Sequence, residues 1–363
     1  MPSESRQDLE RLKTLAKEFD LTLKQAAKAG KKEQAALVKK AKDVIYRQFE
    51  QEKSALEAKL WPYEALLKRE SLAQQYERIK EVYLQSGLIN RELPRSKEPG
   101  ITYKNGEYPF PSLENIIRAL TKDQAKREVL KTKLEQGFVR LHITPLLPIQ
   151  EIKEKLGSAL IKHEEDSKLF KQKRNPNDPD EPLELDETNP VFVYEKFTDE
   201  NLVYHPRLFD KDNPRGITKD QLIESSTFPG YSVILIEDMA FQPKDNEGQT
   251  IAQGTRSERK QLENNQTPDQ YLETILNNPN YHAESGWTIE DWLSYFLYNL
   301  ETTNQVSNDW DDHNALWLLG NYLPSSGDLP EAYWSRAAHQ AIVVCRDPVD
   351  RYPLWGARPA VRI

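Results

Sequence analysis

The chain has 363 residues, of which 37% are hydrophobic, 9% aromatic and 30% charged, and its formal net charge is −8. This composition is typical of a soluble globular protein of two or three domains and excludes an intrinsically disordered chain. No apolar run approaches the roughly 20 residues that a membrane-spanning helix needs. The negative charge argues against a nucleic-acid partner, whose phosphate backbone attracts basic proteins.

The cysteine content and the first residues bear on the compartment. The only cysteine, Cys345, allows no intrachain disulfide, which fits a reducing environment. The opening residues MPSESRQDLERLK lack the apolar core of a secretory signal. We therefore expect a cytoplasmic protein, although display at a surface through a partner fits the same features.

Residues 1–90 are predicted to form a helical coiled-coil or bundle region. Apolar residues first repeat at alternating steps of three and four, the spacing of a heptad seam. They are Leu9, Leu12, Ala16, Phe19 and Leu23. Further apolar stripes follow on both sides of Pro62 and end near Gly87. A packed spacer or oligomeriser explains the pattern, so a homo-oligomer held by these helices is compatible with it.

The rest of the chain is predicted to be a linker followed by a mixed domain. Residues 91–136 are rich in Pro and Gly at first and then form a short helix, roughly Leu113 to Gln136. Residues 137–363 are predicted to form an α+β domain. Its expected strands include 137–148, 191–197 and 230–239, and its expected helices are 149–166, 267–278 and 286–303, the last two capped by Thr267 and Thr288.

Three stretches carry polar residues that could support chemistry. Asp309, Asp311, Asp312 and His313 could hold calcium or a transition metal, but Asp and Asn equally cap helices and stabilise turns. The segment from Gly248 to Gln261 is polar and basic, which favours a mobile loop over a phosphate site.

The third stretch contains Cys345, which could act as a nucleophile only with a histidine base nearby, and His339 is six residues upstream. The chain has no Gly-x-Ser-x-Gly elbow and no Gly-rich phosphate loop. We therefore predict no catalytic residue, no resident metal and no cofactor.

The last 32 residues, AYWSRAAHQAIVVCRDPVDRYPLWGARPAVRI, use a different set of residue types from the rest of the chain. They contain no Lys, Glu, Met or Asn. One group of positions is predicted to be structural: Trp334, Arg336, Pro348, Gly356, Arg358, Pro359, Val361 and Arg362. The positions between them mix sizes and polarities in a way that a packed strand does not favour. An ordinary C-terminal strand pair is the alternative explanation, because Lys and Glu are depleted in strands.

This tail resembles a known family. The arrangement LLGNYLPSSGDLPEAYWSRAAHQ followed by RDPVDRYPLWGARPAVRI is similar to the C-terminal end of variable proteins of diversity-generating retroelements, a bacterial or phage family with a C-type-lectin fold. The segments FPGYSVILIEDM, TPDQYLETILNN and GWTIEDWLSYFLYNLETTNQV resemble it too, so the likeness covers roughly Gly137 to Ile363.

The resemblance implies a binding function without catalysis. In that family a reverse transcriptase copies a template with errors at adenines, so that AAC codons become NNC, which cannot encode Lys, Glu, Gln, Met or Trp. The variable region would span about 332–356 and contact a ligand, which we expect to be a protein. The implied ligand-binding residues are Tyr333, Ser335, Ala337, His339, Ile342, Val344, Cys345, Val349, Asp350, Tyr352 and Leu354.

Two other functions stay open. The chain could be a coiled-coil scaffold or adaptor whose α+β domain merely packs, or a relative of the formylglycine-generating oxidases, which share the lectin-type fold but use a cysteine pair with copper. The variation hypothesis requires its residues to share one solvent-facing surface, and Ile342, Val344 and Leu354 test it most sharply because such residues are usually buried. Trp334, Val361 and Ile363 should point into the core, and Gly356 should occupy a tight turn.

Overall fold

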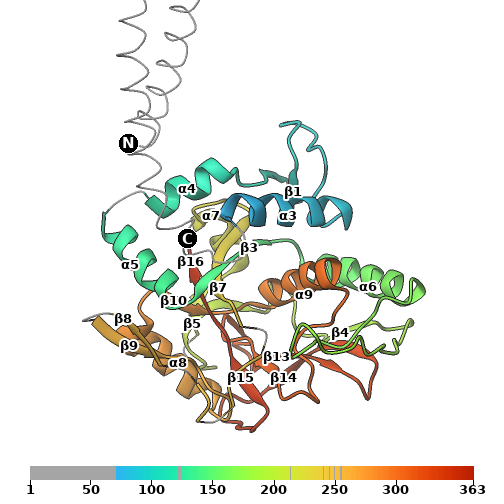
Figure 1. Ribbon diagram of the computed structural model, residues 1–363. Coiled ribbons are helices and arrows are strands. Elements are labelled where there is room, and N and C mark those ends of the chain that lie inside the picture. The colour runs from blue at the N-terminus through green and yellow to red at the C-terminus, as the bar shows by residue number, and fades with distance from the viewer. Residues whose placement is uncertain are drawn as a thin grey trace, which may run out of the picture.

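The computed structural model describes residues 71–363 except 122–123, 213, 240, 245, 249 and 254–255 (Figure 1). The predicted heptad seam and the stripes around Pro62 lie outside these residues. The described part is a mixed α+β structure, as the sequence predicts. Its α-helices are α3 (Leu72–Gln85), α4 (Leu113–Thr121), α5 (Gln124–Glu135), α6 (Ile149–Glu165), α7 (Lys219–Ser225), α8 (Pro268–Asn277) and α9 (Ile289–Thr303).

A four-stranded antiparallel sheet lies at the centre of the molecule. Its strand order is β10 (Glu284–Gly286), β16 (Pro359–Arg362), β7 (Tyr231–Glu237) and β3 (Phe138–Pro145). Every residue of β7 is buried, because it has a strand on each side and helices above it. The C-terminal strand therefore ends inside the sheet, paired with β7.

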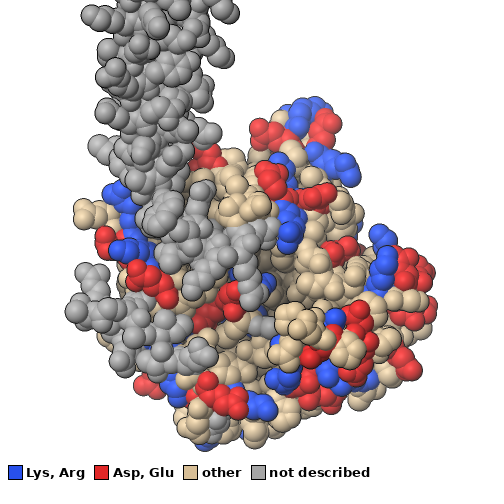
Figure 2. Space-filling view, in the orientation of Figure 1, with Lys and Arg blue, Asp and Glu red and all other residues tan. Residues whose placement is uncertain are grey.

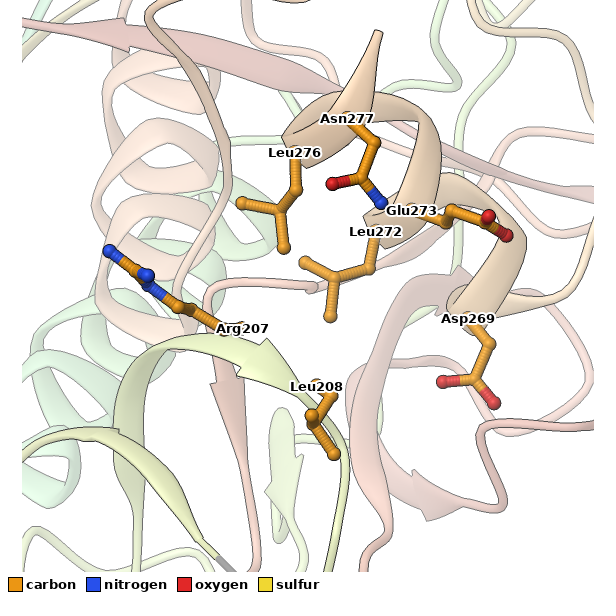
Figure 3. A pocket seen from close by; sticks show the side chains of 7 residues that line it. All are labelled: Arg207, Leu208, Asp269, Leu272, Glu273, Leu276 and Asn277. Carbon is orange, nitrogen blue, oxygen red and sulfur yellow. The ribbon is translucent and has the colours of Figure 1, made fainter.

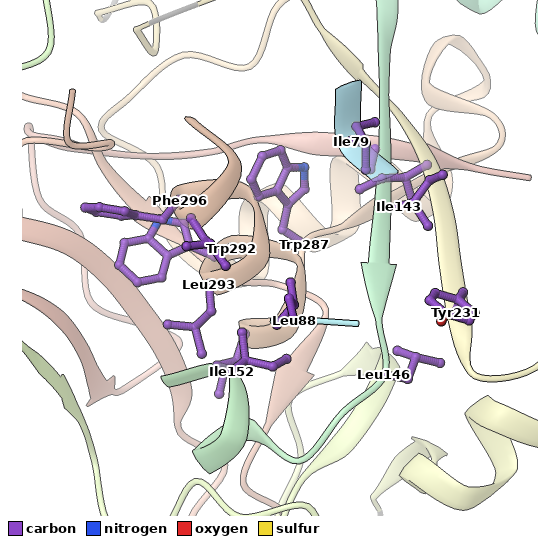
Figure 4. Close-up of a cluster of buried hydrophobic side chains, with 14 of the residues drawn as sticks. Ile79, Leu88, Ile143, Leu146, Ile152, Tyr231, Trp287, Trp292, Leu293 and Phe296 are labelled. Carbon is purple, nitrogen blue, oxygen red and sulfur yellow. The ribbon is translucent and has the colours of Figure 1, made fainter. Parts of the chain in front are cut away.

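The main hydrophobic core joins this sheet to α3, α6 and α9. Figure 4 shows Trp292, Leu293 and Phe296 of α9 close to Ile152 of α6, with Ile143 of β3 across the cluster. The N-cap Thr288 and its partner Asp291 start α9 with a capping box, as predicted. Helices α6 and α9 lie side by side (Figure 1).

A second, mixed sheet carries the tail. Its strand order is β15 (Trp355–Ala357), β11 (Ala315–Trp317), β13 (Leu329–Ser335), β14 (Gln340–Arg346) and β4 (Val191–Val193). In Figure 1, β13, β14 and β15 lie at the end of the molecule opposite α3 and α4. A smaller core that includes Tyr271 of α8, Trp317 and Trp355 covers part of this sheet.

The remaining strands form small sheets. They are β1 (Gly100–Tyr103) with β2 (Gly106–Pro109), β12 (Asn321–Tyr322) with β5 (Val203–Leu208) and β6 (Arg215–Ile217), and β8 (Thr250–Gln253) with β9 (Arg256–Lys260). A short 3₁₀ helix spans Pro279–Tyr281.

Three local predictions are corrected by the structure. Residues 91–136 contain the β1–β2 hairpin and the helices α4 and α5. Ile101 of β1, Ile116 of α4 and Leu130 of α5 join the main core, so much of this segment is not a linker. The segment Gly248–Gln261 forms the β8–β9 hairpin instead of a loop.

Gly356 lies inside β15, opposite Leu316, and not in a turn. A Cβ atom there would lie 2.3 Å from Oδ1 of Asn264, so this glycine allows close packing.

Candidate functional site

The β13–β14 hairpin sorts the tail residues onto two faces. Residues directly opposite each other in an antiparallel pair point to the same side, and neighbours along a strand alternate. On the inner face, Ala332, Trp334, Ala341 and Val343 have no exposed surface. The other face, called the outer face below, carries Leu329, Glu331, Tyr333, Ser335, Gln340, Ile342, Val344 and Arg346. Leu329 and Glu331 at its β13 end are fully buried, and Leu329 belongs to the smaller core.

Four of the predicted ligand-binding residues, Tyr333, Ser335, Ile342 and Val344, therefore share the outer face. Tyr333, Ser335 and Val344 are half-buried, whereas Ile342 is buried, with only 9% of its surface exposed. Opposite Ile342 on the neighbouring strand β4 is Phe192, which is 37% exposed. The outer face is thus apolar near β4, and the expected exposure of Ile342 was wrong because Phe192 and its neighbours cover it.

Cys345 does not belong to this surface. It lies on the inner side, opposite Pro330, and packs against the main core. Its Sγ donates to Oδ2 of Asp328 at 3.4 Å, and burial together with this carboxylate raises the pKa of the thiol to about 12. The thiol stays protonated at neutral pH, and a protonated thiol is a poor nucleophile and a poor metal ligand.

The turn between the strands holds two more predicted residues. Ala337 is exposed. His339 has a left-handed backbone (φ 53°), and its Nε2 lies 3.6 Å from Oε2 of Glu184. The hydroxyl of Ser335 accepts from the backbone N–H of Ala338, which closes the turn. This end of the hairpin is polar and lies beyond the apolar outer face.

The loop between β14 and β15 contains the last four predicted residues. Val349 is 66% exposed and Tyr352 is 38% exposed, while Asp350 and Leu354 are half-buried. Leu354 packs against the smaller core together with Tyr333, which also borders it. The outer face and this loop thus meet at the smaller core through Tyr333 and Leu354, whereas Cys345 and the turn lie apart from them.

Aromatic rings cluster where the loop meets the outer face. The rings of Tyr352 and Trp355 are in contact at a tilt of 45°, with their centroids 3.7 Å apart. The ring of Trp310 contacts those of Tyr333 and Trp355, at centroid distances of 4.7 Å and 5.3 Å. Trp317 lies edge-on to Trp355 at 4.7 Å. We call these five residues the aromatic cluster. It joins tail residues to Trp310 and Trp317, which sequence reasoning did not assign to the site.

An ion pair lies beside the aromatic cluster, and sequence reasoning missed it as well. Nε of Arg346 donates to Oε2 of Glu331 at 3.0 Å, and the guanidinium carbon lies 5.5 Å from the centre of the Trp355 ring. Glu331 is fully buried, and burial raises the pKa of its carboxyl to about 7 against the opposing effect of Arg346. The period-two spacing of Glu331, Tyr333 and Ser335 is the signal that would have placed Glu331 on this face.

The acidic cluster at Asp309 is occupied by cations of the chain itself. Nε of Arg336 donates to Oδ2 of the fully buried Asp309 at 2.8 Å, and Nη2 reaches Asp312 at 3.2 Å. Nζ of Lys171 lies 3.5 Å from Asp312. Among the described residues, no group of three or more His, Cys, Asp or Glu side chains is arranged to hold a metal ion.

The two basic residues of the β8–β9 hairpin whose side chains the structure describes, Arg259 and Lys260, are both paired with carboxylates of the chain. Arg259 is buried and bonds Glu284 through Nε (2.8 Å) and Glu237 through Nη1 (2.7 Å). Lys133, also buried, bonds the same Glu284 at 2.6 Å. The two cations and two carboxylates balance, so this cluster fastens the hairpin and α5 to the central sheet.

A separate hollow lies between α8 and the end of β5 (Figure 3). Leu272 and Leu276 of α8 face Leu208 across it, with Asp269 and Arg207 at its rim. None of the predicted site residues lines it. Two features connect it to the tail: the backbone N–H of Asp269 donates to the carbonyl of Pro348, and Leu272 belongs to the smaller core together with Trp355.

The surface charge is mixed. Figure 2 shows acidic and basic side chains interspersed on the face in view, without a broad basic area. Within the described ranges, no helix combines the length and the apolarity that crossing a bilayer requires. No family model matches the chain, and no curated protein or solved structure is significantly similar to it.

Proposed function

We propose that this chain is a ligand-binding display protein whose C-terminal surface is diversified by a retroelement, with binding of a protein ligand as its activity. The proposal includes a C-type-lectin-type fold for residues 137–363, with which the mixed α+β architecture is compatible. It rests on the resemblance of the tail to such variable proteins and on the residue types that the tail lacks.

One structural observation supports it most. Within the β13–β14 hairpin, residues of the implied variable set alternate with fully buried residues of the scaffold, so Tyr333 and Val344 lie outside while Trp334 and Val343 lie inside. Substitutions at the half-buried outer positions, such as Tyr333 and Val344, change the surface with a smaller loss of core packing than substitutions inside. Tyrosines that keep part of their surface exposed, such as Tyr333 and Tyr352, give a binding surface much contact area at low entropic cost.

The two alternatives receive less support. A formylglycine-generating type of oxidase needs reactive cysteines, and the pKa of Cys345 is raised to about 12 beside Asp328. A scaffold whose α+β domain only packs does not explain the residue types that the tail lacks, nor the exposure of Val349 and Tyr352 beside the aromatic cluster.

The test is the DNA that surrounds the gene. We expect a reverse transcriptase gene nearby and an imperfect repeat of the segment that encodes residues 332–356, differing from it mainly where the repeat has adenine. The codons of Tyr333, Ser335, Ile342 and Val344 should be among the differing ones. A genome with neither the enzyme nor the repeat would contradict diversification.

A further inference from the structure

Arg346 lies beside the aromatic cluster, and the described residues use only part of its hydrogen-bonding capacity. Its guanidinium carries donors on Nε, Nη1 and Nη2. Nε is bonded to Glu331 at 3.0 Å. Among the described residues, no atom accepts a hydrogen bond from Nη1 or Nη2, and the side chain is 38% exposed.

The guanidinium is held in place from two sides. Glu331, fully buried beneath it, bonds its Nε, and the ring of Trp355 lies 5.5 Å from its carbon. Arg346 is therefore ordered before any ligand arrives, which lowers the entropy lost on binding.

Arg346 offers unused hydrogen-bond donors at this surface. Oε1 of Glu331 also has no partner among the described residues, but this oxygen is buried out of reach of a ligand. The two terminal guanidinium nitrogens are thus available to a ligand, and their fork geometry matches the two oxygens of a carboxylate.

We propose that Arg346 is a fixed anchor that binds an acidic side chain of the protein ligand, with Tyr333 and Tyr352 packing against the neighbouring apolar part of that ligand. This inference rests on the proposed binding function and adds to it the chemistry that the surface recognises. Arg346 itself lies outside the set of residues that the resemblance implies to vary.

Between the two anionic groups that a ligand could present, the local charges favour a carboxylate over a phosphate monoester. Asp350 and Glu331 both act electrostatically on this site, so the doubly charged phosphate monoester would be repelled more strongly than a single carboxylate. A ligand cation at the terminal nitrogens is disfavoured because it would meet the positive charge of the Arg346 guanidinium itself.

The experiment selects ligands and then removes one charge at a time. The full chain is panned against a phage-displayed library of random twelve-residue peptides, and selected peptides are synthesised and titrated by calorimetry. Each is compared with versions in which Asp is replaced by Asn or Glu by Gln, and inorganic phosphate is added as a competitor.

The protein variants are Arg346→Lys, which keeps the ion pair but loses the fork, and Arg346→Met, with Arg91→Met at an exposed distant arginine as the control. Circular dichroism verifies that each variant is folded. We expect the selected peptides to be acidic. Replacing the acidic residue by its amide should lower the affinity about 10- to 100-fold, the range for a hydrogen-bonded ion pair. Each Arg346 variant should lower the affinity by a similar factor. The two losses should not add, because they remove the same interaction.

Other outcomes overturn the inference, and they separate it from the proposed function. Three outcomes would contradict a carboxylate as the bound group while leaving the binding surface in place. The peptides could lose binding in Tyr333→Ala and Tyr352→Ala but not in the Arg346 variants. They could instead be enriched in Lys or Arg, or be displaced by phosphate. Failure to select any peptide that depends on Tyr333 or Tyr352 would contradict the binding surface itself.

Discussion

On the inner face of the β13–β14 hairpin, Ala332, Ala341 and Val343 have no exposed surface, whereas on the outer face Tyr333 and Val344 keep part of theirs. Both faces belong to the same two strands and share one set of backbone hydrogen bonds. The backbone and the inner face therefore fix the shape, and the outer face supplies chemistry with little influence on that shape. In the proposed function, the half-buried outer residues carry recognition and the inner residues carry stability.

The largest expected effect is on the inner face. Trp334→Ala should lower the free energy of unfolding by about 3–5 kcal/mol, since it empties a fully buried site in the main core. Its neighbour Tyr333→Ala should cost less than half of that, because the ring is partly exposed already. Urea unfolding followed by circular dichroism measures both. Equal losses would contradict the difference between the faces.

The next effect concerns the buried acid of the outer face. Burial raises the pKa of Glu331 from 4.5 to about 7, so between these values the folded state keeps a proton that the unfolded state releases. Its contribution to stability is therefore present at low pH and is lost as the pH rises through that window. Between pH 5 and 8 the wild type should lose on the order of 2–3 kcal/mol relative to Glu331→Gln.

Unfolding in urea at both pH values measures this loss. Arg346 and Asp350 are the other charged groups that act on Glu331, and both are present in the variant. Asp347→Asn, at an exposed acid of the adjoining loop, is the control and should keep the wild-type pH dependence. Parallel pH profiles for the wild type and Glu331→Gln would show that Glu331 does not titrate in this range.

A smaller effect comes from two adjacent residues of the same type. Val343→Ala should cost about 1.5–2.5 kcal/mol because Val343 is fully buried, and Val344→Ala should cost less than about 1 kcal/mol because it is half-buried. Thermal unfolding of the two variants measures this matched comparison. A larger loss for Val344 would mean that the outer face is packed against something essential.

The smallest effect is expected at the turn. Ala337→Asp changes an exposed side chain that makes no core contact, so the free energy of unfolding should stay within about 0.5 kcal/mol of the wild type. A loss well above 1 kcal/mol, seen in the same unfolding assay, would show that the turn is a structural element and unsuited to variation.

The regular elements were predictable because their signals are local. The apolar spacing of α6 and the threonine caps of α8 and α9 are read within a few residues, and those elements begin where the sequence predicts. The β1–β2 and β8–β9 hairpins were missed because their strands are short and polar, and their pairing depends on distant contacts such as that of Arg259 with Glu237.

The candidate site was predictable only in part. Tyr333, Val344 and Tyr352 stand out by their residue types, but the position of Cys345 on the inner face depends on the register of the hairpin. The pairing of Glu331 with Arg346 joins residues on two strands, and no spacing in the sequence announces it. The burial of Ile342 could not be predicted, because Phe192, its neighbour on β4, lies 150 residues earlier in the chain.

Two matched libraries test the central claim most directly. One randomises the half-buried outer residues Tyr333, Ser335 and Val344 with NNC codons, and the other does the same at Ala332, Ala341 and Val343. In both sets every original residue is encoded by NNC. Each full-length library is displayed on yeast, and resistance to a protease scores the fraction of folded clones. We predict that most outer-face clones stay folded and that few inner-face clones do, because added volume or polarity is not tolerated in the core. Equal folded fractions in the two libraries would contradict the account.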